Sequence, residues 1–171
     1  MNSELLEMDD IDKNIMRIIQ EDPKLTHTEI AKKVKRSQPT IGMRIKKLEH
    51  SGVLRFQAGV NLKAVDLIFA RVDIQTLKVQ EVLNKVKKCI YMINAFILSG
   101  TYNISILVVS PTLDFLDKLV NFHFRKDPDI IDVQIEIVFN TVNDLILPIN
   151  FTYERCDFSS EKCSSCLQRE K

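Results

Sequence analysis

The sequence predicts an α+β protein made of two successive modules, because the hydrophobic periodicity changes along the chain. Up to about residue 52, apolar residues recur three or four positions apart, which is the spacing of helices. From residue 53 onward, the period-2 alternation of strands dominates and is interrupted by two further helical segments. A chain of 171 residues can hold two small domains. We expect domains at residues 1–61 and 62–151, followed by a tail at residues 152–171.

Two short helices with a tight break between them are predicted within residues 25–52. Thr26 and Glu29 have the spacing of a capping box, so one helix should begin directly after Thr26. Ser37 can cap a second helix, and Pro39 fits only in a first turn. The buried face of that second helix is expected at Ile41, Ile45 and Leu48. This spacing is typical of a helix-turn-helix, whose second helix enters the major groove of DNA.

Positive charge is concentrated in the same region of the chain. The whole protein has 24 basic and 23 acidic residues, for a net charge of only +1. Residues 30–55 hold eight basic residues against one acidic residue, whereas residues 1–29 and 61–171 are each net negative. A local basic block is the electrostatic signature of a phosphate-binding surface. The alternative is an ordinary solvated helix face that is rich in lysine.

The N-terminal sequence resembles the winged helix-turn-helix of the Lrp/AsnC (leucine-responsive/asparagine regulator) family of transcriptional regulators. Over residues 8–61, MDDIDKNIM, IA and SQPTIGMRIKKLEHSGVL match the family pattern LDxxDxxIL, LA and SxxTVxxRVxxLExxGVI. Two positions depart from the pattern: Arg36 replaces a usual apolar residue, and Pro39 is unusual before Thr40. The resemblance implies a sequence-specific DNA-binding regulator of transcription.

The residues expected to meet DNA lie on the outer side of the second helix and in the turn before it. Gln38 suits an adenine edge, and Arg44 suits a guanine edge or a phosphate. Thr40 or Met43 suits a thymine methyl group, while the lysines position the protein on phosphates without specifying sequence. The predicted DNA-binding residues are Lys33, Arg36, Ser37, Gln38, Thr40, Met43, Arg44 and Lys47.

Downstream, the order β-α-β-β-α-β is predicted, after an extended wing or connecting strand at residues 53–60. The expected strands are 68–75, 91–98, 104–109 and 131–139, and the expected helices are 79–86 and 113–120. This order is that of the ferredoxin-like split βαβ unit, an antiparallel sheet with helices on one face. The other face should carry Phe69, Phe96, Leu98 and Val138 among polar residues. We therefore expect a homodimer that packs sheet to sheet.

Residues 66–145 resemble the ligand-sensing RAM domain that accompanies this DNA-binding module in the family. The resemblance implies dimers formed through the sheet, with assembly up to tetramers or octamers. It also implies an effector pocket between subunits, for an amino acid, beside a Gly-x-Tyr-Asp loop. That loop is Gly100, Thr101, Tyr102 and Asn103 in this chain. The amide of Asn103 cannot pair with an ammonium group as a carboxylate does, and a plain hairpin turn is the alternative.

The C-terminal segment carries three cysteines, Cys156, Cys163 and Cys166, after an apolar stretch at residues 145–151 that is expected as a final strand or swapped arm. Cysteines at this spacing suit zinc or an iron–sulfur cluster, and a dithiol switch or a plain tail are the alternatives. Zinc would need a fourth ligand, such as Cys89, a histidine, an acidic group or a residue of a second chain. A metal-responsive or redox-responsive regulator is therefore an alternative function.

Other classes of protein find less support in the sequence. The three histidines lie in separate segments, and neither a nucleophile–base motif nor a phosphate-binding glycine loop occurs. We therefore expect no enzymatic activity. No apolar run approaches ~18 residues, and the acidic N-terminus lacks the order of a signal peptide, so a cytoplasmic protein without membrane association is predicted. An architectural protein that compacts DNA with low specificity remains an alternative.

Overall fold

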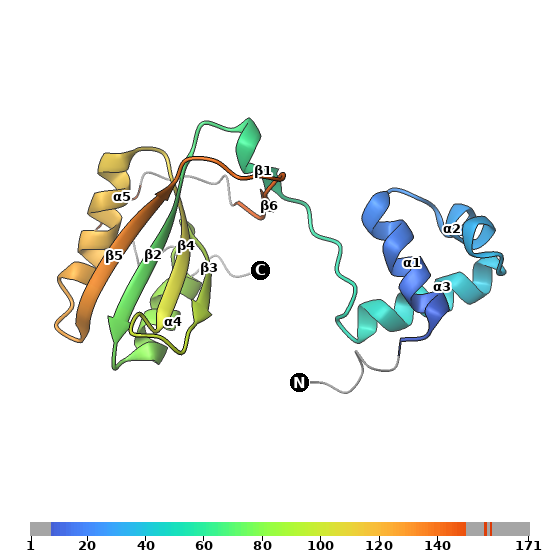
Figure 1. Cartoon of the computed structure of the whole chain (residues 1–171), viewed down its shortest axis with the longest axis horizontal. Helices are drawn as coiled ribbons and strands as arrows, with labels where there is room; N and C mark the ends of the chain where they lie inside the picture. Colours follow the sequence, from blue (N-terminus) through green and yellow to red (C-terminus); the bar gives the residue numbers. More distant parts are fainter. Residues whose placement is uncertain (1–7, 150–155, 157, 159–171) are drawn as a thin grey trace. The chain divides into compact units, whose positions relative to one another are not determined.

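The computed structural model describes residues 8–149, 156 and 158, and the chain divides into two compact units. Unit 1 is residues 1–57 and unit 2 is residues 58–171. Unit 1 is helical, and unit 2 is a sheet with helices (Figure 1). Each unit has its own apolar core, so each is described by itself below.

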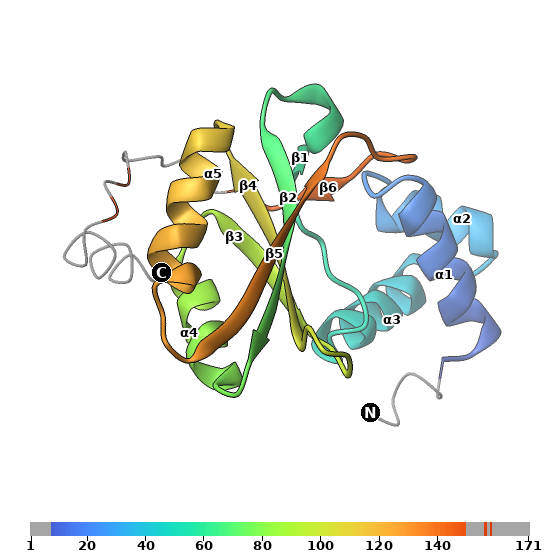
Figure 2. The same ribbon diagram turned by 60° about the vertical axis from the view of Figure 1, so that its left-hand side comes forward.

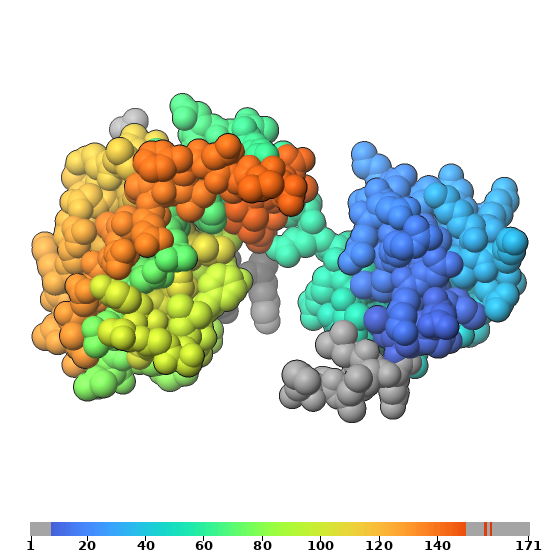
Figure 3. Space-filling model, viewed as in Figure 1, coloured from blue at the N-terminus to red at the C-terminus, as the bar shows by residue number. Residues whose placement is uncertain are grey.

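Unit 1 consists of three helices, α1 (Asp10–Glu21), α2 (His27–Val34) and α3 (Gln38–His50). Its core is centred on Ile15, Ile30 and Ile41, one from each helix, which are at most 2% exposed. The complete buried cluster is Ile15, Ile18, Ile19, Ile30, Ala31, Ile41, Ile45, Leu48 and Leu54. The predicted inward face of α3 is therefore confirmed. In Figure 3 the visible atoms of the three helices form one continuous surface.

Both predicted helix starts in the helix-turn-helix are confirmed by their hydrogen bonds. Thr26 Oγ1 accepts the backbone N–H of Glu29 at 3.3 Å, and the Glu29 carboxylate accepts the backbone N–H of Thr26 at 2.7 Å. Ser37 Oγ accepts the backbone N–H of Thr40 at 3.4 Å. These bonds satisfy N–H groups that have no partner within their own helix.

Two residues with positive φ angles end the helices of this motif. Lys35, at φ 55°, ends α2 and reverses the chain toward α3. Gly52, at φ 75°, follows α3 and is the left-handed stop that the sequence predicts. A lysine in the left-handed region is uncommon because its Cβ crowds the backbone, so the sequence pattern did not single out Lys35 as the turn residue.

The extended segment after α3 forms a strand only at its end. Residues 55–59 have no regular structure, and β1 (Val60–Asn61) pairs antiparallel with β6 (Ile146–Leu147). Figure 3 shows the orange segment that follows β5 against the green segment near β1. Of the two alternatives for residues 53–60, the connecting strand is therefore found in short form, and no paired wing strand occurs between α3 and β1.

Unit 2 contains the predicted β-α-β-β-α-β order. The elements are β2 (Ile68–Thr76), α4 (Val79–Lys88), β3 (Met92–Ile97), β4 (Ile104–Ser110), α5 (Leu113–Val120) and β5 (Ile130–Val138). A short 3-10 helix, Leu62–Ala64, precedes β2, and a π-helical turn, Asn121–Arg125, continues α5. The four strands are antiparallel neighbours in the order β3-β4-β2-β5, so β2 is paired on both sides.

One face of this sheet packs on α4 and α5. Ala70, Val72 and Ile74 of β2 are fully buried, and they share one cluster with Val82 of α4 and Leu119 of α5. Figure 2 shows both helices on the same side of the sheet. The predicted alternation of β2 is thus confirmed, and neither of the two described α-helices of unit 2 lies over the opposite face of the sheet.

The predicted alternation of β5 is wrong at both of its ends. A register shift at Gln75 and Thr76 pairs Thr76 with Ile130, so the strand bulges at Ile131. Because a bulge changes the side-chain phase by one residue, Ile130 packs on the core while Ile131 is 58% exposed. Phe139 lies after the last residue of the strand and is 95% exposed.

His123, in the π-helical turn, is buried and does not titrate near neutral pH. Only 7% of the surface of His123 is exposed. Burial is the main cause that lowers the pKa of His123 to about 4, and the nearby positive charge of Lys85 acts in the same direction. Lys85 Nζ donates to the backbone oxygen of His123 at 2.9 Å and pairs with Asp127. The imidazole is therefore neutral at pH 7.

Replacing Gly59 should destabilise unit 2, because this glycine lies tightly against β6. An added Cβ would stand 2.7 Å from Ile146 Cγ2 and 2.9 Å from the backbone oxygen of Leu147. We expect Gly59→Ala to lower the free energy of unfolding of unit 2 by about 1–3 kcal/mol in urea titrations. Gly100→Ala is the matched control, since the nearest atom would be 3.9 Å away. Equal effects of the two substitutions would contradict the steric explanation.

Candidate nucleic-acid interface

Almost all the basic side chains within residues 30–55 are exposed and form no ion pair within the described chain. Seven of the eight are exposed, and the exception is Arg44. The seven are Lys32, Lys33, Lys35, Arg36, Lys46, Lys47 and Arg55. Only Arg44 among the eight forms an ion pair with a described carboxylate. An uncompensated cluster of cations attracts polyanions and releases their counterions on binding.

The outward surface of α3 carries a polar, an apolar and a basic side chain. Gln38 and Lys47 are exposed, and Met43 is 67% exposed. No side-chain hydrogen bond within residues 8–149 involves Gln38 or Lys47, so their polar atoms are available to another molecule. A large exposed apolar side chain such as Met43 suits a thymine methyl group.

Ser37 and Thr40 are engaged with each other at the start of α3. Their hydroxyl oxygens are 2.7 Å apart, and Ser37 Oγ also caps the helix. The backbone N–H groups of a helix N-terminus and nearby hydroxyls form hydrogen bonds with phosphate oxygens. These two predicted DNA-binding residues thus have a structural role in addition to the predicted one.

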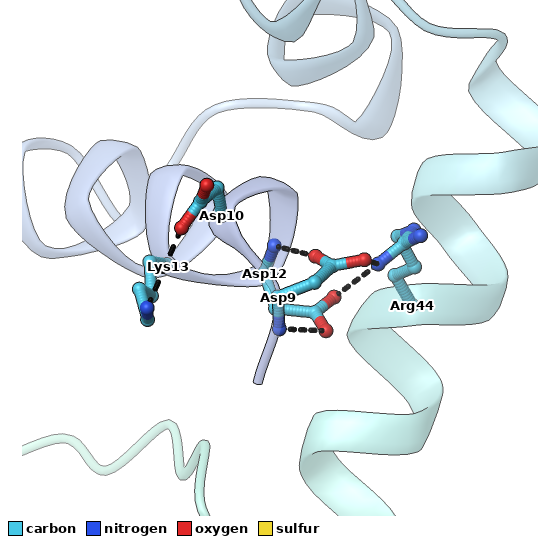
Figure 4. Close-up of polar contacts among 5 residues, drawn as sticks. All are labelled: Asp9, Asp10, Asp12, Lys13 and Arg44. Carbon is cyan, nitrogen blue, oxygen red and sulfur yellow. Dashed lines mark hydrogen bonds and ion pairs between the residues drawn. The ribbon is translucent and has the colours of Figure 1, made fainter. Parts of the chain in front are cut away.

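Arg44 is held by two carboxylates of unit 1. Its Nη1 atom lies 2.8 Å from Asp9 Oδ2 and 2.8 Å from Asp12 Oδ1 (Figure 4). The hydrogen bonds that Arg44 donates to Asp12 and, second, to Asp9 raise the pKa of Arg44. The backbone N–H of Asp12 is the main cause that lowers the pKa of the Asp9 carboxyl, and Arg44 adds to this effect. The Asp9 carboxyl is therefore charged at neutral pH.

Asp9 and Asp12 contact Arg44 but are not among the site residues that the sequence predicts. They form the capping box of α1: Asp9 Oδ1 accepts the Asp12 N–H at 2.8 Å, and Asp12 Oδ2 accepts the Asp9 N–H at 3.4 Å. The Asp-x-x-Asp spacing is a recognisable signal for such a box. The contact with Arg44 has no comparable signal, because the residues are more than thirty positions apart.

The loop predicted to bind an effector joins β3 and β4 in unit 2. The Asn103 amide is bonded in both directions to Thr76: Nδ2 donates to its backbone oxygen at 2.7 Å, and Oδ1 accepts its backbone N–H at 3.1 Å. The Tyr102 hydroxyl donates to Asp132, and this bond raises the pKa of Tyr102. Thr101 is exposed. Asn103 therefore ties the loop to the end of β2, a role that the sequence did not indicate.

The predicted metal ligands are only partly within the described residues. Cys156 is half-buried and packs on the core of unit 2, whereas Cys163 and Cys166 lie outside the described residues. The ring of Phe158 packs at a tilt against that of Phe115, with ring centroids 4.9 Å apart. Within residues 8–149, 156 and 158, no group of three His, Cys, Asp or Glu side chains could hold a metal ion. The zinc or iron–sulfur site stays a prediction.

Comparison with known proteins agrees with this geometry. Residues 8–55 match the family model described as winged helix-turn-helix DNA-binding. The HTH-type transcriptional regulator FL11 of Pyrococcus furiosus is 31% identical over 118 residues, which are 67% of this chain and 78% of that protein. The uncharacterized HTH-type transcriptional regulator PH0140 of Pyrococcus horikoshii is 28% identical over 127 residues, with coverage of 70% and 78%.

Solved structures share the fold over most of this chain. E. coli AsnC has a TM-score of 0.71 at 20% identity and covers 80% of this chain and 95% of its own. An AsnC family transcriptional regulator from Agrobacterium tumefaciens has a TM-score of 0.69 at 26% identity, with coverage of 80% and 93%. Fold and interface together define a DNA-binding transcriptional regulator. The chain belongs to the Lrp/AsnC family, whose members are regulators and not enzymes.

None of the helices in the described part of the chain is long and apolar enough to cross a membrane.

Restoring the usual family residue at position 103 should destabilise the loop in this chain. The carboxylate of Asn103→Asp could accept the Thr76 N–H but would face the Thr76 backbone oxygen without a proton to donate. We expect a loss of about 1–3 kcal/mol in the unfolding free energy of unit 2 at pH 7. Thr101→Asp, at an exposed position of the same loop, is the matched control. An unchanged stability of Asn103→Asp would refute the two-way bond.

Proposed function

We propose that this regulator binds specific operator DNA as a homodimer, with α3 of each subunit in the major groove. The observation that carries the proposal is the cluster of seven exposed basic residues around α2 and α3, none of which forms an ion pair with a described carboxylate. A surface of this charge within the helix-turn-helix suits the phosphates on both sides of a groove. Lys33 and Arg36 would position the protein, while residues of α3 face the bases.

Base recognition is assigned to the outward face of α3. Gln38 would pair with an adenine edge, Met43 would contact a thymine methyl group, and Lys47 would contact a base edge or a phosphate. Support comes from the exposure of these side chains and from the absence of internal partners for the polar ones within residues 8–149.

The face of the sheet opposite α4 and α5 supports the proposed dimer. Phe96 and Leu98 are 47% and 44% exposed there. Arg71, on the same face, pairs with Asp73 at 3.1 Å and with Glu136 at 2.7 Å. The Oδ1 atom of Asp73 is buried without a hydrogen-bond partner in the described chain. A second copy packed on this face would cover the apolar side chains, and tetramers or octamers would follow by further assembly of dimers.

An effector such as an amino acid is proposed for the loop of residues 100–103 at the subunit interface. One structural relative, regulator NMB0573 of Neisseria meningitidis, was solved as a complex with L-Met; its TM-score is 0.73 at 21% identity, with coverage of 84% of this chain and 97% of that one. Because the Asn103 amide is occupied by Thr76, an ammonium group would need another partner. The Asp132 carboxylate beside Tyr102 has the required charge.

The function is tested by selecting bound sequences from a random DNA pool and footprinting the recovered operator. A footprint confined to two half-sites, about 34 Å or a multiple apart, supports the proposal. Broad protection of every sequence would instead support a DNA-compacting protein. Repeating the titration with each amino acid, with a chelator and with an oxidant distinguishes an effector at the loop from a signal received by the cysteines of the tail.

Neutralising a phosphate contact should weaken binding to every sequence alike. We expect Lys33→Gln to lower affinity for operator and scrambled duplex roughly fivefold at 0.15 M salt, and to reduce the slope of log K against log[salt] by about 0.9. Fluorescence anisotropy over a range of salt concentrations measures both quantities. Lys87→Gln, at an exposed position of α4, is the charge-matched control. A loss restricted to the operator would show that Lys33 reads bases.

Charge placed on the open face of the sheet should separate the subunits. We expect Phe96→Glu to shift the protein from dimer to monomer in sedimentation equilibrium, because an unpaired carboxylate is disfavoured in an apolar interface. Leu113→Glu is the control, since Leu113 is 58% exposed on α5, on the helical side of the sheet. A wild-type monomer at all concentrations would exclude the dimer.

A further inference from the structure

Arg44 differs from every other basic residue of the interface in its surroundings. It is the one of the eight whose guanidinium contacts described carboxylates, at 2.8 Å to Asp9 and 2.8 Å to Asp12. Its side chain is 28% exposed, and that of Asp12 is 9% exposed. The pair therefore lies at the edge of the core of unit 1, where α1 and α3 meet (Figure 4).

We infer that Arg44 is a positioning residue of DNA recognition, which fixes α3 to the start of α1 and contacts neither a base nor a phosphate. The inference rests on the proposed function and deepens it, because it removes the one arginine of α3 from the reading surface. Specificity then falls to Gln38, Met43 and Lys47, whose side chains point away from the core.

The surroundings of Arg44 favour the aspartates over DNA as its partners. Both carboxylates contact Nη1, and their combined negative charge disfavours a phosphate at the other two guanidinium nitrogens. Turning the guanidinium away toward a phosphate would leave the Asp12 carboxylate, whose side chain is 9% exposed, without its cation. Removing one partner from a buried ion pair is strongly unfavourable, whereas an ion pair exposed to water contributes little to the free energy. The exchange is therefore unfavourable, and Arg44 remains with the aspartates.

The same cluster marks a boundary of the DNA-binding surface. Two carboxylates around one guanidinium leave a net negative charge, and Asp10 adds a third carboxylate at the start of α1, where it contacts Lys13 at 3.4 Å. Acidic groups are favourable at a helix N-terminus, but they repel phosphates. The start of α1 should therefore lie outside the surface that contacts the DNA backbone. The basic side of α2 and the turn between α2 and α3 should lie within that surface.

A comparison of two substitutions that each remove one positive charge from α3 tests this role. Arg44→Met and Lys47→Met are titrated with operator and scrambled duplex at several salt concentrations, after circular dichroism has verified that both are folded. For Arg44→Met we expect an unchanged salt slope and a loss of operator preference of about tenfold or more, spread over several base pairs because α3 is displaced. For Lys47→Met we expect the salt slope to fall by about 0.9 if it contacts a phosphate.

Asp12→Asn and the double variant that combines Asp12→Asn with Arg44→Met complete a double-mutant cycle. A positioning role predicts that Asp12→Asn also reduces operator preference, and that the double variant loses no more than Arg44→Met alone. A reduced salt slope for Arg44→Met, a preference lost at one base pair only, or tighter binding by Asp12→Asn through a released Arg44 would each overturn the inference. A purely stabilising role would leave the preference of the folded protein unchanged, and that result overturns it too.

Binding by the wild-type protein tests the proposed function separately from the role of Arg44. If the wild type binds all duplexes equally, the sequence-specific function fails, while the salt slopes of Arg44→Met and Lys47→Met still decide whether Arg44 contacts phosphates. If the wild type binds no duplex, both proposals fail.

Discussion

The contact among Ile15, Ile30 and Ile41 is the constraint on which the DNA-binding unit depends. These side chains are buried where the three helices meet, and apolar burial of this kind is the main favourable term in a small domain. Once Ile41 faces the core, the 3.6-residue period places Met43 and Lys47 on the outside. Arg44 falls at the border between the two faces, where it reaches the aspartates of α1.

The sheet unit follows the same logic with a period of two. Because Ala70, Val72 and Ile74 are buried under the helices, Arg71 and Asp73 must face the opposite way. Polar groups at the centre of this mixed face limit how a second surface can fit against it. One alternating strand therefore specifies both the interior of the subunit and the chemistry of the surface that a partner would meet.

Local patterns explain what the sequence predicted well. The capping residues Thr26 and Ser37, the inward face of α3 and the order of strands and helices all depend on neighbours within four positions in the chain. The bulge at Ile131 was missed because its register depends on pairing with a distant strand. The Arg44 cluster and the amide bonds of Asn103 were missed for the same reason, since their partners lie 27 or more positions away.

The pairing of β1 with β6 has a consequence for the order in which the chain folds. Val60 and Leu147 lie near opposite ends of the described part of unit 2, so their contact closes a loop that contains the entire sheet. A two-residue ladder cannot offset the entropy of closing so long a loop unless the sheet has already formed. During synthesis, unit 1 can fold when its own residues have emerged. The strand that follows it must wait for Leu147.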